Sequence, residues 1–253
     1  MRRYLTYFQI FVRSFFIQSC WNFKSLLSIG FAFSVVPVAK KIFKDDTVGY
    51  NGFVKRHLSF FNGHPYFTLF AMGAVAKLEE QIAEGTCDVE KIDRFKNALI
   101  GPLGALGDQI FWAIVKPATL TIGVLGFFLI EDISWRLAFL IVLGVLYNIP
   151  HFYIRILGLV KGYNEGFGIC KYLKIENFKT VTKIYSILGI VSLGLLTGWI
   201  GVQYTKFNLY GIAVFAGSII IATLLKSKKS KTYLAMLLPL SLAVIAGILQ
   251  SSL

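Results

Sequence analysis

The sequence predicts an all-α, polytopic membrane protein with re-entrant hairpins and broken helices. Hydrophobic residues make up 56% of the 253 residues, and the mean hydropathy is +0.66. Charged residues make up only 15%, against roughly 25% in soluble domains. Uncharged apolar runs follow one another along the chain, and glycine, proline or an acidic residue interrupts several of them. The same composition excludes disordered, collagen-like and disulfide-rich classes.

Residues 1–24 alternate basic and aromatic side chains and show no small-residue cleavage site after a short apolar core. Arginine and aromatic side chains both favour the headgroup region of a bilayer. We therefore predict an uncleaved, amphipathic N-terminal segment that lies on the cytoplasmic face or in the membrane interface.

Residues 25–183 are predicted to form a transport core of re-entrant segments and connecting helices. Its uncharged runs are shorter than the ~20 residues that span a bilayer as a helix. Irregular backbone at membrane depth survives only where protein or a wet cavity surrounds it. Charged connectors at residues 40–56 and 84–96 are predicted to lie in water. The uncharged runs are residues 25–39, 65–76, 100–106, 117–130 and 137–149.

Residues 184–253 are predicted to be C-terminal membrane helices, with spans at residues 184–204, 207–225 and 233–253. Lysines cluster at residues 171–183 and 226–231, whereas the turn between the first two spans holds a single cation, Lys206. Cationic loops favour the cytoplasm. We therefore expect both lysine clusters and the N-terminus inside, and Leu253 outside.

The formal net charge of +13 does not indicate a nucleic acid partner, because the basic residues fall largely between apolar runs, where the lipid bilayer is the expected partner. Cys20, Cys87 and Cys170 are too far apart in the sequence for a metal knuckle or a redox pair. The three histidines show no catalytic spacing. We predict no metal, no cofactor and no self-contained active site.

A turn at residues 60–66 places Asn62 and His64 before Pro65, which suits the first position of a helix. Two interpretations fit this turn. Either Asn62 or His64 caps the helix, or both side chains offer directional hydrogen bonds to a polyhydroxylated ligand at membrane depth.

The helix that follows is predicted to carry a solvated stripe of Lys77, Glu80, Gln81 and Glu84, at the spacing of one helical face. Glu79 lies on the opposite, apolar face. A carboxylate there costs several kcal/mol unless it is paired, protonated or in contact with a polar ligand. Glu79 is thus the stronger binding candidate, and the alternative is a helix-end side chain that reaches the membrane interface.

Three glycines and Pro102 within residues 101–107 are predicted to break the helix there, so that Asp108 caps a helix that resumes at Gln109. Asp108 is either this cap alone or also a ligand contact at an unwound segment. Trp21 and Trp112 offer indole faces that either stack on a sugar ring or anchor helices at the interface.

The motifs in these segments have the order and spacing of the IID component of mannose-family sugar phosphotransferase systems, and from about Phe11 onward the chain resembles that family. The matching residues are Trp21-Asn22-Phe23, Arg56-His57-Leu58-Ser59-Phe60-Phe61-Asn62-Gly63-His64-Pro65, Leu78-Glu79-Glu80-Gln81, Gly101-Pro102-Leu103-Gly104-Ala105-Leu106-Gly107-Asp108-Gln109-Ile110-Phe111-Trp112 and Lys116-Pro117.

This resemblance implies a multi-pass subunit of the bacterial cytoplasmic (inner) membrane that pairs with a IIC subunit, as a trimer of such pairs, to translocate a sugar. Cytoplasmic IIA and IIB partners would relay phosphate from phosphoenolpyruvate, and this chain would carry no phosphorylated residue of its own. Departures at Ser59, Gly63, Gly104-Ala105 and Gln109 leave the sugar open. The alternative is a membrane scaffold or receptor-like component without its own transport site.

We expect the polar residues of the two broken segments to converge on the sugar. The expected substrate-binding residues are Asn62, His64, Glu79 and Asp108, with Glu80 and Gln81 in support.

Overall fold

The computed structural model describes residues 2–205, 217 and 220. The chain divides into two compact units, residues 1–190 and 191–253. The predicted spans at residues 207–225 and 233–253 and the lysine loop at 226–231 lie outside the described residues, apart from positions 217 and 220. The division predicted from the sequence, at residues 1–24, 25–183 and 184–253, stays a prediction.

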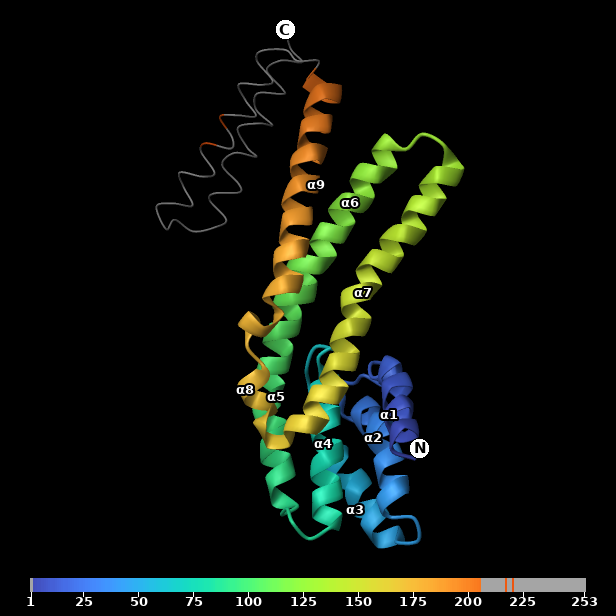
Figure 1. The fold of residues 1–253 in the computed structure, drawn as a ribbon, viewed down its shortest axis with the longest axis vertical. Coiled ribbons are helices and arrows are strands. Elements are labelled where there is room, and N and C mark those ends of the chain that lie inside the picture. The colour runs from blue at the N-terminus through green and yellow to red at the C-terminus, as the bar shows by residue number, and fades with distance from the viewer. Residues whose placement is uncertain (1, 206–216, 218–219, 221–253) are drawn as a thin grey trace. The chain divides into compact units, whose positions relative to one another are not determined.

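The described part of the chain is helical and contains no β-strand, only two isolated bridges that join Leu26 to Asn22 and to Phe61. This confirms the all-α prediction. The helices, shown in Figure 1, are α1 (Arg2–Arg13), α2 (Ser28–Ile42), α3 (Thr47–His57), α4 (Thr68–Ala83), α5 (Glu90–Gly107), α6 (Lys116–Leu129), α7 (Ile133–Glu165), α8 (Ile169–Tyr172) and α9 (Lys179–Thr205), with the short helices η1 (Ser14–Phe16), η3 (Gly166–Gly168) and η4 (Ile175–Phe178) and the π-helix η2 (Asp108–Val115).

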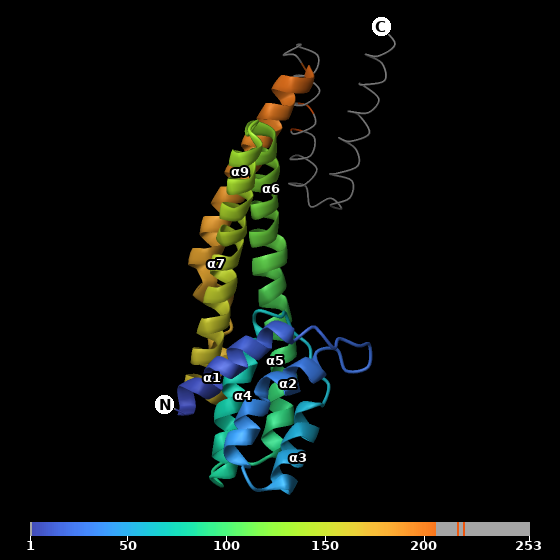
Figure 2. The same cartoon turned by 90° about the vertical axis from the view of Figure 1, so that its right-hand side faces the viewer.

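Helices α1 to α4 gather at one end of the first unit, around the first turns of α5 (Figures 1 and 2). Helix α4 is at the centre of this group, because residues all around it are buried. Its backbone packs very closely on that of α7. A Cβ added to Gly73 would lie 2.3 Å from the carbonyl oxygen of Leu159, and one added to Gly162 would lie 2.2 Å from that of Phe70. Small residues therefore set this crossing.

The start of α4 differs from the sequence prediction. The helix begins at Thr68 instead of Pro65. The carbonyl oxygen of His64 accepts hydrogen bonds from the N–H groups of Phe67 and Thr68, so a tight turn comes before the helix. Neither Asn62 nor His64 caps α4, whose N-terminal residue Phe67 has no side-chain cap.

The break predicted at residues 101–107 is absent. Pro102 lies inside α5, and the chain passes from α5 through the π-helix η2 into α6 without interruption. Asp108 has helical backbone angles and makes no capping hydrogen bond, so its predicted role as a cap is wrong. A π-helix widens the turn instead of ending the helix.

Helix α7 likewise continues through Pro150 for 33 residues, so the apolar run at residues 137–149 is not a separate short segment. Helices α6 and α7 form a hairpin that extends away from the α1–α4 end (Figure 1). Within the described residues, three stretches are long and apolar enough to cross a membrane: Glu90–Leu129, Ile133–Tyr172 and Ile175–Ile200. The last includes most of the first predicted C-terminal span.

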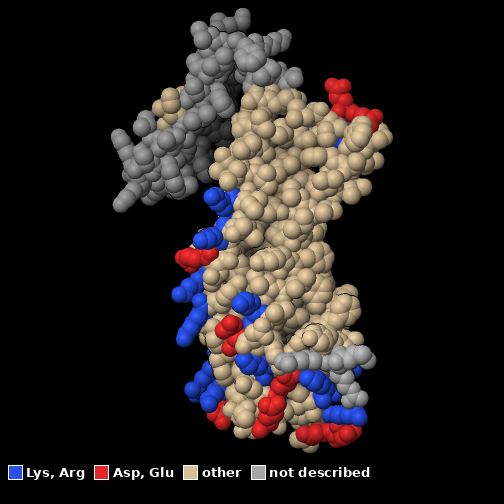
Figure 3. Space-filling view, in the orientation of Figure 1, with Lys and Arg blue, Asp and Glu red and all other residues tan. Residues whose placement is uncertain are grey.

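Charged side chains gather at the α1–α4 end and along one edge of the first unit, and acidic side chains reappear at the tip of the α6–α7 hairpin (Figure 3). The connector residues Asp45, Asp46 and Glu84 are exposed, as the sequence predicts for segments in water. Lys96, the last residue of the second connector, departs from this prediction because it is buried. Between these charged regions the visible surface carries almost no Lys, Arg, Asp or Glu side chains.

Candidate functional site

The turn that holds His64 packs directly on the end of α5. A Cβ atom added to Gly107 would lie 2.1 Å from the Cβ of His64, so glycine alone permits this contact. Gly63 packs on Leu103 one turn earlier, where an added Cβ would lie 3.2 Å from the leucine Cβ. The two segments singled out in the sequence, residues 60–66 and 101–112, are therefore neighbours.

The His64 ring is buried and stacks on Phe111, with ring centroids 5.4 Å apart. Its Nδ1 accepts a hydrogen bond from the backbone N–H of Tyr66 at 3.3 Å. Burial, together with the charges of Arg155 and His151, lowers the pKa of His64 to about 4. The ring is therefore neutral at pH 7 and carries its proton on Nε2. Within the described residues this Nε2–H has no hydrogen-bond partner, so it is an available donor.

A cavity of about 180 Å³ lies beside this ring, and we refer to it as the His64 cavity. The exposed Trp112 indole forms part of its wall, and the Lys116 ammonium lies 4.1 Å from the indole centroid. The hydroxyls of Tyr66 and Tyr147 lie 3.2 Å apart. The lining residues are Gln18, His64, Pro65, Tyr66, Phe111, Trp112, Lys116 and Tyr147. Aromatic faces with a few directional polar groups suit a small polar ligand.

Buried hydrogen bonds hold the wall of this cavity from behind. The Tyr66 ring stacks on His151, with centroids 3.9 Å apart. Arg155 donates from Nε to Nε2 of His151 at 2.6 Å and from a terminal nitrogen to the hydroxyl of Ser14 at 2.7 Å. Because Nε2 of His151 accepts, its Nδ1 carries the proton and donates to Asn148 Oδ1 at 3.1 Å. Helix α7 and the start of the chain thus fix the cavity wall.

Glu79 lies elsewhere, in a buried ionic cluster near the far end of α4. Its side chain is 0% exposed. Arg56 donates to both carboxylate oxygens at 2.6 Å, and His57 Nε2 donates to Oε1 at 2.8 Å. Burial alone would raise the pKa of Glu79, but the hydrogen bonds from Arg56 and His57 outweigh it and hold this pKa below its usual value. Burial lowers the pKa of His57 to about 4, against the opposing pull of Glu79.

Lys96 of α5 joins the same cluster although only 1% of it is exposed. Its ammonium donates to the carbonyl oxygen of Arg56 at 3.0 Å and to the Ser59 hydroxyl at 2.8 Å. The Ser59 hydroxyl also lies 3.1 Å from Asp93 Oδ1. We call these residues the Glu79 cluster, which links α3, α4 and α5: Arg56, His57, Ser59, Glu79, Asp93 and Lys96.

Glu80 and Gln81 also lie in the last turns of α4. Glu80 pairs with Lys41 Nζ at 2.7 Å and accepts a hydrogen bond from the Tyr163 hydroxyl at 2.5 Å. The carbonyl oxygen of Gln81 accepts from the N–H and the hydroxyl of Thr86. The predicted site residues therefore form two groups at opposite ends of α4. His64 and Asn62 lie just before its start, and Asp108 follows Gly107, on which His64 packs, whereas Glu79, Glu80 and Gln81 lie at its end.

The family profile described as "PTS system mannose/fructose/sorbose family IID component" matches residues 4–216. The chain belongs to this IID family. The mannose-specific EIID component of Escherichia coli K12 is 33% identical over 201 residues, which cover 79% of this chain and 68% of that protein. The fructose permease IID component of Bacillus subtilis is 30% identical over 203 residues, covering 80% and 70%.

A solved structure described as the mannose transporter ManYZ in complex with microcin E492 superposes with a TM-score of 0.59 at 31% identity, covering 76% of this chain and 69% of that one. A second, described as a membrane protein, gives a TM-score of 0.64 at 30% identity over the same shares. This IID component is accordingly a membrane subunit of a sugar phosphotransferase system.

In the IID component, Asp108 is exposed at the first position of η2, directly after the glycine on which His64 packs. Asn62 is partly buried in the turn between Phe61 and Gly63. The sequence interpretation did not identify Tyr66, Tyr147 or Lys116 as cavity residues, because they come from three different helices or turns. It also missed Arg56 and His57 as partners of Glu79. A carboxylate on an apolar face needs a cation. Arg56 is the last residue of the charged connector at residues 40–56 and His57 follows it, which was the available signal.

Proposed function

We propose that this IID component forms, with a IIC subunit, the complex that translocates a sugar and couples its uptake to phosphorylation. IIA and IIB phosphocarriers pass phosphate from phosphoenolpyruvate to the entering sugar, and the assembly is a trimer of IIC–IID pairs. The family membership supports this proposal, as does the similarity to a transporter described as ManYZ. The chain lies in the bacterial cytoplasmic membrane as a multi-pass protein with its N-terminus in the cytoplasm.

We further propose that the His64 cavity contributes the sugar contacts of this subunit. One observation carries the proposal: a buried, neutral histidine with a free Nε2–H donor faces a cavity walled by an exposed indole. The indole face stacks on the sugar ring, and the Nε2–H donates to a hydroxyl. Asn62 lies two residues before His64, and Asp108 directly follows Gly107, on which His64 packs, so both can supply further acceptors. The IIC partner lies on the other side.

The Glu79 cluster supports this site indirectly. Both carboxylate oxygens of Glu79 already accept hydrogen bonds from Arg56 or His57, which leaves the carboxylate little capacity for a sugar hydroxyl. Glu80 is engaged by Lys41 and Tyr163 in the same way. We therefore assign direct contact with the sugar to Asn62, His64 and Asp108. Glu79 and its neighbours hold α3, α5 and α7 around α4.

The test is uptake and phosphorylation of a panel of sugars by cells that co-express this chain with its IIC partner and the phosphocarriers. His64→Asn keeps an acceptor near Nδ1 for the Tyr66 N–H but removes the Nε2 donor, whereas His64→Gln keeps a donor near Nε2. We expect uptake to fall at least about tenfold in His64→Asn, equivalent to about 1.4 kcal/mol, and to recover in His64→Gln.

Glu84→Gln, on an exposed helix end, is the control and is expected to be silent. Levels of the membrane complex must be matched before uptake is compared. Normal uptake by His64→Asn, Trp112→Ala and Asp108→Asn would contradict the site. The scaffold alternative gains support if the IIC partner alone also binds the sugar with unchanged affinity.

A further inference from the structure

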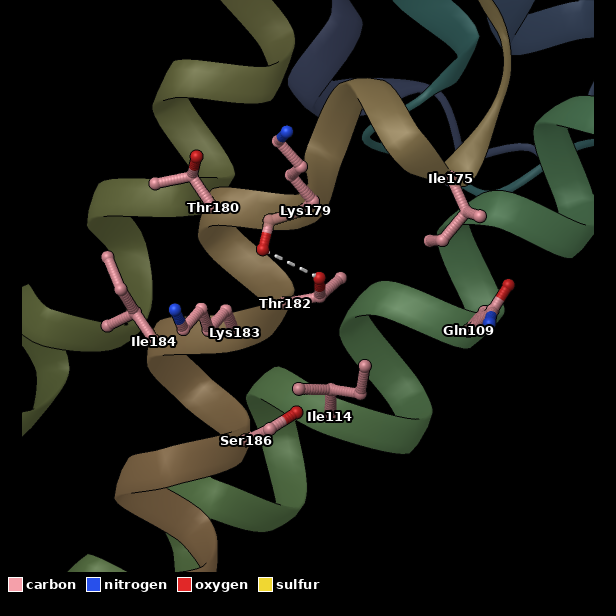
Figure 4. A pocket seen from close by; sticks show the side chains of 9 residues that line it. All are labelled: Gln109, Ile114, Ile175, Lys179, Thr180, Thr182, Lys183, Ile184 and Ser186. Carbon is pink, nitrogen blue, oxygen red and sulfur yellow. Dashed lines mark hydrogen bonds between the residues drawn. The ribbon is translucent and has the colours of Figure 1, made fainter.

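A second, larger pocket of about 810 Å³ lies away from the His64 cavity, between the π-helix η2 and the start of α9. We refer to it as the α9 pocket. Figure 4 shows side chains reaching it from both sides, Gln109 and Ile114 from η2 and the others from η4 and α9. The lining residues are Gln109, Ile114, Ile175, Lys179, Thr180, Thr182, Lys183, Ile184 and Ser186.

The polar part of the α9 pocket is cationic. Lys179 and Lys183 are exposed and lie four residues apart on one helix, a spacing at which like charges repel. Neither forms a salt bridge within the described residues. Residues 171–183 contain four lysines and one acidic residue, Glu176. Thr180 and Ser186 also line the pocket and add hydroxyl groups to its polar part. The pocket thus has the chemistry of an anion site.

The remaining part of the α9 pocket is apolar. Ile114, Ile175 and Ile184 form part of its wall. The apolar surface continues beyond the pocket along α9, where Ile184 and Ile187 are each 51% exposed. A free inorganic anion gains nothing from such a wall, whereas an amphiphile with an anionic head and a hydrocarbon tail matches both parts.

The depth of the pocket agrees with this chemistry. About 20 helical residues cross a hydrocarbon layer of about 30 Å. Counted back from Leu129 at the α6–α7 tip, that length ends at Ile110, and counted forward from Ile133 it ends at Phe152. Gln109 and Ile114 therefore lie where the hydrocarbon gives way to headgroups. Lysines at this level face the anionic surface of the cytoplasmic leaflet.

We propose that the α9 pocket binds the headgroup of an anionic phospholipid. The lipid phosphodiester lies between the ammonium groups of Lys179 and Lys183, and an acyl chain follows Ile184 and Ile187. This site is separate from the His64 cavity and does not depend on sugar recognition there. The lipid holds the start of α9 against η2.

The experiment uses the complex of this chain with its IIC partner, purified and returned to nanodiscs that contain either phosphatidylglycerol or phosphatidylcholine. Native mass spectrometry counts the lipids retained when the complex is released. The variant is Lys179→Gln/Lys183→Gln. The control is Lys40→Gln/Lys44→Gln, which removes two exposed lysines of the same spacing elsewhere on the chain.

We expect the wild-type and control complexes to retain phosphatidylglycerol at least about tenfold better than phosphatidylcholine, and the pocket variant to lose this preference at an unchanged Tm. Ile184→Ser should weaken retention of the same lipid while the lysines remain. Equal retention of the two lipids by the wild-type complex, or an unchanged preference in the pocket variant, would overturn the proposal.

Two further outcomes would also overturn it. In the first, inorganic phosphate alone stabilises the wild-type complex and the Ile184→Ser complex equally but does not stabilise the pocket variant. The pocket would then be a phosphate site. If the pocket variant loses binding of the IIB partner while it keeps the lipid preference, the lysines form a protein docking surface. None of these measurements depends on sugar uptake, so a failure of the sugar-site proposal would not affect the result.

Discussion

Glu79 shows how much of this protein's interior depends on a few ionic contacts. A buried carboxylate is tolerated because Arg56 binds both of its oxygens and His57 adds a third hydrogen bond. Taking such groups out of water is costly, and the loss of one partner leaves an uncompensated charge. The cluster therefore makes the relative positions of α3, α4 and α5 specific as well as stable.

Replacement of Glu79 by glutamine should destabilise the complex by about 3–5 kcal/mol, the usual cost of breaking a buried ion pair. Arg56 and Lys96 would remain without a balancing carboxylate on α4. Thermal unfolding of the purified IIC–IID complex measures the change, with Glu84→Gln as the exposed control. An unchanged Tm in Glu79→Gln would show that the pair contributes nothing to stability.

The stability of the complex should fall as the pH falls from about 6.5 towards 4. In this window the unfolded chain binds protons at His57 and His64 that the folded chain does not bind, because burial lowers both pKa values to about 4. Each histidine accounts for roughly 3 kcal/mol across the window. Below the usual pKa of glutamate, protonation of Glu79 in the unfolded chain adds to the loss.

The measurement is Tm against pH for the wild-type complex and for His57→Gln, whose amide nitrogen replaces the Nε2 donor to Glu79. The variant should show a smaller decrease of Tm between pH 6.5 and 4. The same slope in both proteins would mean that His57 does not titrate as inferred.

At this scale the sequence predicted that Glu79 is exceptional, because its helix face is otherwise apolar. The sequence could not predict which cationic side chains pair with Glu79. Arg56 and His57 come from α3, Lys96 comes from α5, and their approach depends on how the helices pack. The same holds for His64, whose neighbour Gly107 is far away in the sequence but so close in space that a Cβ added to it would lie 2.1 Å from the Cβ of His64.

Among the elements, α4 and α7 form the closest helix pair through Gly73, Gly158 and Gly162. At each position an added Cβ would meet the opposing helix at 3.0 Å or less, and at Gly73 and Gly162 it would meet backbone atoms, which cannot move aside. Glycine here permits a close helix–helix approach and leaves no room for any other residue.

Gly162→Ala should therefore lower the yield and the Tm of the complex markedly, through a clash that exceeds the usual gain of alanine in a helix. Gly144→Ala is the matched control, because it lies on the same helix α7 and an added Cβ there meets nothing within 4 Å. We expect this control to be neutral or slightly stabilising. A normal Tm in Gly162→Ala would show that the two helices can separate at little cost.

The α5–η2–α6 run shows where local sequence rules fall short. Glycines and Pro102 predict an end to the helix, because proline removes a hydrogen bond and glycine lowers helix propensity. In the structure the neighbours hold the helix together: Gly107 accommodates His64, and Leu103 and Phe111 are buried. Tertiary packing thus overrides the local signals, and the irregularity remains as a π-helical stretch beside both pockets.

On the scale of the whole molecule, the sequence predicted the class of protein well, because composition and apolar runs report directly on the surrounding lipid. It underestimated the length of the spans, since Pro150 and the segment at residues 101–107 interrupt the pattern but not the helices. The structure also leaves large aromatic side chains exposed, such as Trp21 and Phe23 in the loop before α2 and Tyr4 and Phe8 on α1.

Exposed aromatic residues at one end of a membrane subunit contact either the membrane interface, as predicted for residues 1–24, or a partner. We expect this chain, expressed alone, to aggregate or to be degraded, and to become monodisperse only when it is co-expressed with its IIC partner. Size-exclusion chromatography in detergent distinguishes the two cases. A stable, monodisperse, sugar-binding monomer would contradict the requirement for a partner.

The orientation in the membrane follows from charge. The tip of the α6–α7 hairpin holds Glu131 and Asp132, and the Arg136 guanidinium there donates to the carbonyl oxygen of Ile130. Lysines gather at the other end of the hairpin, at residues 171–183. Because cationic segments stay in the cytoplasm, the hairpin tip should lie outside, and so should Leu253 at the end of the chain.

Cysteine labelling from outside the cell tests this orientation in a chain whose three natural cysteines are replaced by serine. A membrane-impermeant maleimide should modify Glu131→Cys and Leu253→Cys, and should spare Lys44→Cys and Ser230→Cys until the membrane is opened. The two outer positions should agree with each other, because three predicted spans, at residues 184–204, 207–225 and 233–253, separate the lysines at residues 171–183 from Leu253. If Glu131→Cys were protected and Lys44→Cys labelled, the lysines at residues 171–183 would face outward. Lys179 and Lys183 would then not face the anionic cytoplasmic leaflet, and the depth of the α9 pocket would no longer support a bound lipid there.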